Sequence, residues 1–152
     1  MCEMIRNQWY AIMESKEVKK KPVGVTRMNE KLVLWRNSKG ELSCIHGQCC
    51  HRGASLSFGC VIKDEIECPF HGFRYDTHEK VPERFKVNGY KIKEKHGLIW
   101  LWYGDQYQEE IPPIPFFNEL SEGFVYRTFS EVWNVHYTRA IENQLDAIHL
   151  PF

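Results

Sequence analysis

Two short cysteine and histidine motifs constrain this chain more than any other feature. The first is Cys49-Cys50-His51, the second is Cys68-Pro69-Phe70-His71, and sixteen residues separate them. Each motif offers one thiolate and one imidazole, so the two together supply four metal ligands. A chain with these motifs is expected to fold so that two loops share one metal centre.

Two kinds of metal centre use two cysteines and two histidines. In a [2Fe-2S] cluster of mixed ligation, two thiolates hold one iron and two neutral imidazoles hold the other. Each loop then supplies one ligand of each kind, and a spacing of two or three residues lets one turn reach both irons. A structural zinc site is the alternative, because zinc takes the same four donors in a tetrahedron. Gly53 and Gly72 favour the cluster, since glycine lets the backbone approach closely.

The residues around both motifs carry a resemblance to a known family. Residues 49–57 (CCHRGASLS) and 68–76 (CPFHGFRYD) resemble the two cluster loops of Rieske non-haem iron oxygenases. The resemblance implies a mainly β fold, a Rieske-type antiparallel β-sandwich with two cluster-binding loops. It also implies a [2Fe-2S] cluster with Cys49 and Cys68 on the inner iron and His51 and His71 on the outer iron. The flanking residues have no role in a zinc finger, which counts against zinc.

Other positions in the loops refine the resemblance. The Rieske proteins of respiratory cytochrome complexes carry an additional cysteine in each loop, but Ala54 and Phe70 stand at those positions here. This favours the oxygenase and ferredoxin branch. Cys50 is a departure, because the family more often has proline or another non-thiol residue there. Cys44-x-His46 has the same ligand spacing but lacks the following Arg-Gly-Ala, so we interpret it as a strand end. The cysteines outside the ligand set are expected to be free thiols: Cys2, Cys44, Cys50 and Cys60.

Short apolar runs and turns predict a small antiparallel β domain up to about residue 105. The lysine-rich run 16–21 is expected to be a solvated loop. The predicted strands cover residues 8–12, 31–36, 41–45, 60–62, 65–68, 90–94 and 98–103.

The chain changes character after the β domain. The proline-rich run Ile111-Pro112-Pro113-Ile114-Pro115 predicts a linker over residues 111–123. Residues 124–129 have strand composition, and residues 136–149 have helical periodicity, with Ala140, Ile141, Leu145 and Ile148 on the apolar side. One strand and one helix cannot bury a core of their own, so this tail either packs on the β domain or opens a second domain. Together with the resemblance, this implies a Rieske domain over 1–110, a linker over 111–123, and the start of an α+β catalytic domain over 124–152.

A second, shorter motif supports that organisation. Asn143, Asp146 and His149 resemble the start of the catalytic-domain motif of the same oxygenases, Asn-x2-Asp-x2-His-x4-His. The resemblance implies that His149 is the first ligand of a mononuclear Fe(II), and that Asn143 lies close to this iron. It implies that Asp146 bridges to a cluster histidine of a neighbouring subunit. Taken alone, an Asp and a His three apart on a helix are more often a surface pair.

The mononuclear site is expected to be incomplete in these 152 residues. The second histidine of the motif would fall two residues past Phe152, and the carboxylate of the facial triad comes from much later in the family's chain. We therefore expect a sequence cut within the catalytic motif. The family consists of oxidoreductases, but this chain by itself is expected to hold the cluster without catalysing oxygenation.

Charge and hydropathy exclude some partners. The chain has 20 Lys plus Arg and 20 Asp plus Glu, and this balance argues against a nucleic-acid partner. The longest stretches without these residues, 42–51 and 53–62, are about half a membrane span. The first residues lack the basic and apolar regions of a secretory signal, so we expect a cytoplasmic protein.

The resemblance implies a function and leaves one alternative. A flavin- or ferredoxin-type reductase would supply electrons, and the Rieske portion would pass them to a mononuclear iron that activates dioxygen. The reaction would be hydroxylation or O-demethylation of a small organic substrate, in a homotrimer. The alternative is a free-standing Rieske ferredoxin that acts only as an electron carrier. Most such ferredoxins would end near residue 105 to 110, so the remaining residues count against it.

Overall fold

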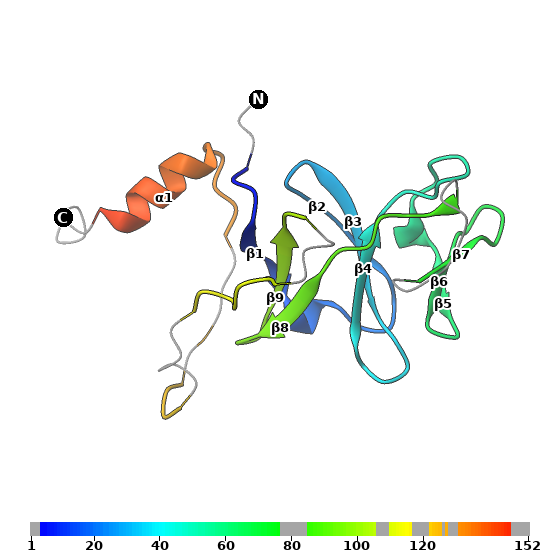
Figure 1. The fold of residues 1–152 in the computed structure, drawn as a ribbon, viewed down its shortest axis with the longest axis horizontal. Helices are drawn as coiled ribbons and strands as arrows, with labels where there is room; N and C mark the ends of the chain where they lie inside the picture. The colour runs from blue at the N-terminus through cyan, green and yellow to red at the C-terminus, as the bar shows by residue number, and fades with distance from the viewer. Residues whose placement is uncertain are drawn as a thin grey trace.

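The computed structural model describes residues 4–76, 85–105, 110–116, 122–125, 127 and 131–146. Strands dominate, and three antiparallel sheets of three strands each form the body of the molecule (Figure 1), which confirms the predicted mainly β class. The strand orders are β1-β9-β8, β2-β3-β4 and β5-β6-β7. The elements are β1 (Gln8–Glu14), η1 (Ser15–Glu17), β2 (Val23–Arg27), β3 (Glu30–Arg36), β4 (Leu42–His46), η2 (Leu56–Phe58), β5 (Cys60–Ile62), β6 (Glu65–Glu67), β7 (Arg74–Tyr75), β8 (Ile92–Lys95), β9 (Leu98–Tyr103) and α1 (Tyr137–Leu145).

The β3–β4 hairpin shows how local sequence builds a sheet. Its turn is organised by Asn37, whose side-chain oxygen accepts hydrogen bonds from the backbone N–H groups of Lys39 (3.0 Å) and Glu41 (2.9 Å). An asparagine in this role replaces a backbone turn with its own side chain. The resulting register pairs Leu34 with Cys44. The predicted hairpin is confirmed, as are the strand pairs β5–β6 and β8–β9.

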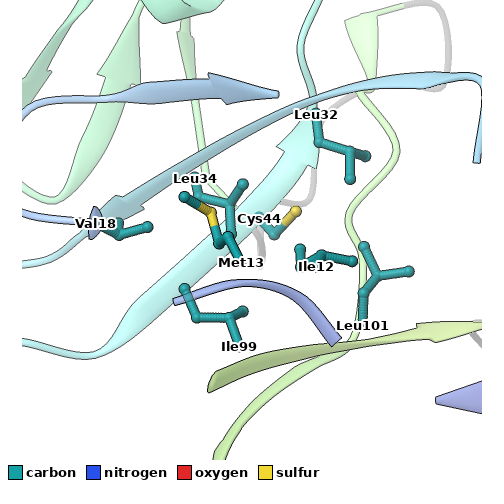
Figure 2. Packing of buried hydrophobic residues seen from close by; sticks show 8 residues of the cluster. All are labelled: Ile12, Met13, Val18, Leu32, Leu34, Cys44, Ile99 and Leu101. Atoms are coloured by element: carbon teal, nitrogen blue, oxygen red, sulfur yellow. The ribbon is translucent and has the colours of Figure 1, made fainter. Parts of the chain in front are cut away.

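The middle sheet is buried on both faces because side chains alternate along β3. Leu32 and Leu34 point into one core, and Val33 and Trp35 point into the other. The first core lies between the sheets of β3 and β9, and Figure 2 shows its side chains converging from both. Its buried members are Ile12, Met13, Val18, Leu32, Leu34, Cys44, Ile99 and Leu101.

The second core holds the predicted metal-binding loops. It lies between the middle sheet and the β5-β6-β7 sheet, and its buried members are Val33, Trp35, Ile45, Cys49, Leu56, Ile66, Cys68 and Tyr75. The Trp35 indole N–H donates to the carbonyl oxygen of Asp64 in the β5–β6 turn, at 2.9 Å. This contact joins the two sheets, so the small β5-β6-β7 sheet is held against a rigid neighbour.

Several elements differ from the sequence-based expectations. Strands β2 and β7 were not expected. Within the predicted strand 124–129, the described residues Phe124, Val125 and Arg127 are not in a strand. Strand composition alone does not make a strand, because a strand needs a neighbour to pair with.

The tail contributes one short helix. His136 caps α1, and its Nδ1 atom accepts a hydrogen bond from the backbone N–H of Thr138. The last helical residue is Leu145, and the rest of the predicted helix, from residue 147 onward, lies outside the described residues. No residue of α1 is buried. In Figure 1, α1 and the β5-β6-β7 sheet lie at opposite ends of the molecule.

Among the helices described, none is long and apolar enough to cross a membrane.

Candidate metal centre

The two cysteine loops have the same backbone hydrogen bonds. In the first loop the Cys49 N–H donates to the Ala54 carbonyl (2.9 Å), and the Gly53 N–H donates to the Cys49 carbonyl (2.8 Å). In the second loop the Cys68 N–H donates to the Phe73 carbonyl (2.7 Å), and the Gly72 N–H donates to the Cys68 carbonyl (3.0 Å). Each cysteine therefore begins a closed turn of the same size.

Both turns depend on a glycine four residues after the cysteine. Gly53 has φ +68° and Gly72 has φ +73°, a left-handed conformation that side chains with a Cβ disfavour. The sequence suggested these glycines for close backbone approach. The structure adds a conformational requirement, because any other residue would strain the turn.

The turns bury the thiols and expose the imidazoles. Cys49 and Cys68 are 4% and 2% exposed. His51 and His71 are exposed, and their ring centroids lie 4.8 Å apart at an interplanar angle of 57°. The structure therefore pairs the two thiols in the interior and the two imidazole rings at the surface.

Hydrogen bonds to Cys49 Sγ favour the thiolate form of this cysteine. Burial works to raise its pKa, but donors around the sulfur hold the pKa below the ordinary cysteine value. These are the Tyr75 hydroxyl, the backbone N–H groups of His51 and Arg52, and the Cys68 thiol. A thiolate is the form of cysteine that binds metal.

Tyr75, which sequence reasoning missed, lies directly beside the thiols. Its hydroxyl oxygen is 3.0 Å from Cys49 Sγ and 3.3 Å from Cys50 Sγ. Burial, and then the two thiols, raise the pKa of this hydroxyl, so it stays protonated and able to donate. The only sequence signal was its place within the second motif. Its contact with the first loop depends on how the loops pack.

The donor arrangement fits a two-iron cluster better than a single ion. A zinc site needs its four donors around one centre. A mixed-ligand cluster needs one thiol pair and one imidazole pair, each on its own iron. The buried pair of thiols and the exposed pair of imidazoles match the second requirement.

The other cysteines lie outside this arrangement. All five described cysteines are free, and Cys50 and Cys60 are exposed. Cys44 is fully buried in β4, as expected for a strand residue, and burial raises the pKa of its thiol. Cys2 lies outside the described residues.

The residues expected to serve a second iron are only partly described. Asn143 lies on the exposed surface of α1. Asp146 follows the helix as its C-cap, and its backbone N–H donates to the Glu142 carbonyl at 3.0 Å. His149 lies outside the described residues. The end of α1 is not near the cysteine loops of the same chain (Figure 1).

Comparison with known families identifies the metal-binding region. The model of the Rieske [2Fe-2S] domain matches residues 8–91, which is more than half of the chain. The chain belongs to the Rieske [2Fe-2S] domain family. Its metal group is accordingly a [2Fe-2S] cluster, and the zinc alternative is set aside.

Similarity to individual Rieske proteins extends over nearly the whole chain. Chlorophyllide a oxygenase of Chlamydomonas reinhardtii is 34% identical over 99% of this chain and 24% of that protein. The oxygenase component of dicamba O-demethylase from Stenotrophomonas maltophilia is 28% identical over 97% of this chain and 47% of that protein. A crystal structure of dicamba monooxygenase superimposes with a TM-score of 0.70 and 29% identity, covering 80% of this chain and 42% of that one. The chain thus spans less than half the length of these relatives.

Proposed function

We propose that this chain is the Rieske [2Fe-2S] electron-transfer portion of a ring-hydroxylating or O-demethylating oxygenase. In this role it receives electrons from a flavin- or ferredoxin-type reductase and delivers them to a mononuclear Fe(II) that activates dioxygen. The observation that carries the proposal is the extent of similarity to oxygenase components, 97–99% of this chain. A free-standing ferredoxin would account only for the residues up to about 110.

In this proposal the four loop residues hold the cluster. Cys49 and Cys68 would hold the inner iron, and His51 and His71 the outer iron. When bound, the cluster supplies one-electron redox chemistry. The chain's own residues set the conditions: burial keeps water from the thiols, the Tyr75 hydroxyl donates to Cys49 Sγ, and the exposed imidazoles offer electrons a short exit.

The division of the chain also belongs to the proposal. Residues 1–110 would form the Rieske domain, 111–123 the linker, and 124–152 the start of the catalytic domain. His149 would be the first ligand of the mononuclear iron, with Asp146 bridging to a cluster histidine of a neighbouring subunit in a homotrimer. The positions of α1 and the cysteine loops at opposite ends of one chain support transfer between subunits (Figure 1).

The partners follow from the same similarity. Two relatives are named for the demethylation of dicamba and of methylxanthine, so we propose a small organic substrate. We also propose a cytoplasmic location. The exposed free thiols of Cys50 and Cys60 support it, because a reducing compartment keeps thiols free.

Metal analysis tests the cluster assignment. Iron, acid-labile sulfide and zinc would be measured per chain on anaerobically purified protein. Two irons and two sulfides are expected. Zinc without sulfide would overturn the cluster, and with it the proposed function.

The oxygenase role has its own test. The nucleotide sequence after the codon for Phe152 is expected to continue in frame and to encode a second histidine two residues on. In the protein carrying that continuation, Asp146→Asn is expected to slow single-turnover oxidation of the reduced cluster without changing its visible spectrum. Unchanged kinetics would remove Asp146 from the electron path. A stop codon directly after Phe152 would favour the ferredoxin alternative.

A further inference from the structure

One hydroxyl group is shared by two cysteine side chains beside the cluster site. The Tyr75 oxygen lies 3.0 Å from Cys49 Sγ and 3.3 Å from Cys50 Sγ. Cys50 is exposed, yet its thiol also lies 3.5 Å from the Phe85 carbonyl oxygen. The Cys50 thiol thus has two oxygen atoms within hydrogen-bond distance, one on Tyr75 and one on Phe85.

The number of protons on these three side chains determines the direction of their hydrogen bonds. A tyrosine hydroxyl has one proton to donate and an oxygen that can accept. Cys49 as an iron ligand is a thiolate, so it can only accept, and the Tyr75 proton must point to it. The Tyr75 oxygen is then left as an acceptor. The Cys50 thiol has one proton and two acceptor oxygens within reach, and we assign the proton to the nearer one, the Tyr75 oxygen at 3.3 Å, over the Phe85 carbonyl oxygen at 3.5 Å.

We propose that Cys50 is a positioning residue for the cluster, acting through Tyr75. Its S–H group donates to the Tyr75 oxygen, which makes the Tyr75 hydroxyl a stronger donor to Cys49 Sγ. Consecutive hydrogen bonds strengthen one another in this way. Hydrogen bonds to cluster sulfurs are among the factors that set the reduction potential, and a stronger one stabilises the more negative, reduced state. Cys50 therefore raises the potential of the cluster.

This inference rests on the cluster assignment and not on the oxygenase reaction. Its failure would leave the proposed electron transfer unaffected. It also gives a role to the residue at which this chain departs from the common loop sequence.

Four variants of the cluster-loaded protein test the inference by redox titration followed by visible circular dichroism. Cys50→Ala removes the donor and is expected to lower the midpoint potential. Cys50→Ser keeps a donor and is expected to stay closer to the unsubstituted protein. Tyr75→Phe is expected to lower the potential further than Cys50→Ala. In the double variant, Cys50→Ala is expected to add no shift, because its effect passes through the Tyr75 hydroxyl.

Controls separate this effect from a general one. Cys60→Ala replaces the other exposed cysteine among those described and is expected to leave the potential unchanged. An unchanged potential in Cys50→Ala would overturn the inference, and so would a shift that persists in the Tyr75→Phe background. A higher potential in Cys50→Ala would show that Cys50 competes for the Tyr75 proton, which also overturns it. Cys50→Val serves as a second donor-free variant, and loss of iron and sulfide from both would mark a structural role instead.

Discussion

Large apolar side chains are buried in the β-sheet cores at one end of the molecule and exposed in the C-terminal tail at the other. At the β-sheet end, residues such as Leu34, Trp35 and Leu101 are fully buried between sheets. In the C-terminal tail, Val125 is 98% exposed and Leu145 is 78% exposed, and no residue of α1 is buried. The same residue type, leucine, is a core residue in one region and a surface residue in the other.

This difference shows where the stability of the described structure resides. Helix α1 has nine residues, which is short for a helix that must be stable in water without packing. Local interactions support it, including the His136 cap and the ion pair between Arg139 and Glu142. The sheets, by contrast, bury two cores and hold the cysteine loops in place. Changes at the sheet end should therefore matter far more than matched changes in the tail.

The largest expected effect is loss of the cluster. Cys68→Ala removes a buried thiol from the ligand set, so the protein is expected to purify without the full complement of iron and sulfide. Cys60→Ala, in β5, which pairs with the strand directly before Cys68, is expected to retain both. Iron and sulfide analysis checks the pair, and a fully loaded Cys68→Ala protein would contradict the assignment.

A matched pair of leucine substitutions tests the contrast in stability. Leu101→Ala leaves a cavity in the first core and is expected to lower the free energy of unfolding by about 2–5 kcal/mol. Leu145→Ala, in the tail, is expected to change it by less than about 0.5 kcal/mol. Urea unfolding measures both. A similar loss in the two variants would mean that α1 packs on the protein as strongly as the core does.

Two histidine substitutions compare the effect of the cluster end and of the tail on the midpoint potential. His71→Cys is expected to keep iron but to lower the midpoint potential, because a thiolate adds negative charge to the cluster. His136→Gln removes the cap of α1 and is expected to leave the potential where it was. If His71→Cys also left it unchanged, His71 would not be a ligand.

The smallest expected effect concerns two ion pairs and pH. Hydrogen bonds from Arg36, and then from Ser15, hold the pKa of Glu94 below its usual value. A carboxylate with a lowered pKa in the folded state stabilises the protein above the unfolded pKa, and this stabilisation is lost as pH falls through the folded pKa. Glu94 is 45% exposed, so its contribution is expected to be below about 1 kcal/mol.

Matched variants measure this contribution against the tail. The difference in unfolding free energy between the protein and Glu94→Gln is expected to be largest near neutral pH and to vanish in acid. Glu142→Gln breaks the exposed pair on α1 and is expected to cost less at every pH. An equal, pH-independent loss in both would show that the Arg36 network is no stronger than a surface pair.

Local patterns predicted the sheet end well. Asn37 organises the turn of the expected β3–β4 hairpin, and the glycines of both loops were recognised from the motifs. Strand β2 was missed because its apolar alternation is limited to Val23 and Val25, and none of its residues is fully buried. Its turn to β3 runs through Met28 and Asn29, both at positive φ. That turn lacks the Asn-Gly or Asp-Gly pair that usually marks such hairpins.

The tail was harder to predict because its partners are not local. Residues 124–129 have strand composition, but a strand forms only where another strand pairs with it. The helix was expected because its periodicity is local, and it begins one residue after the predicted start. Two residues of its predicted apolar side, Ile141 and Leu145, are exposed in the described structure.

By itself, the sequence identified the candidate cluster ligands and predicted that they lie in two similar loops. Ligand type, ligand spacing and the glycine of each turn are properties of a few adjacent residues, so they can be identified before the fold is known. Only the tertiary structure decided that the thiols are buried, that the imidazoles are exposed, and that Tyr75 lies between Cys49 and Cys50. These features depend on the packing of loops about 20 residues apart in the chain, and no local pattern encodes that packing.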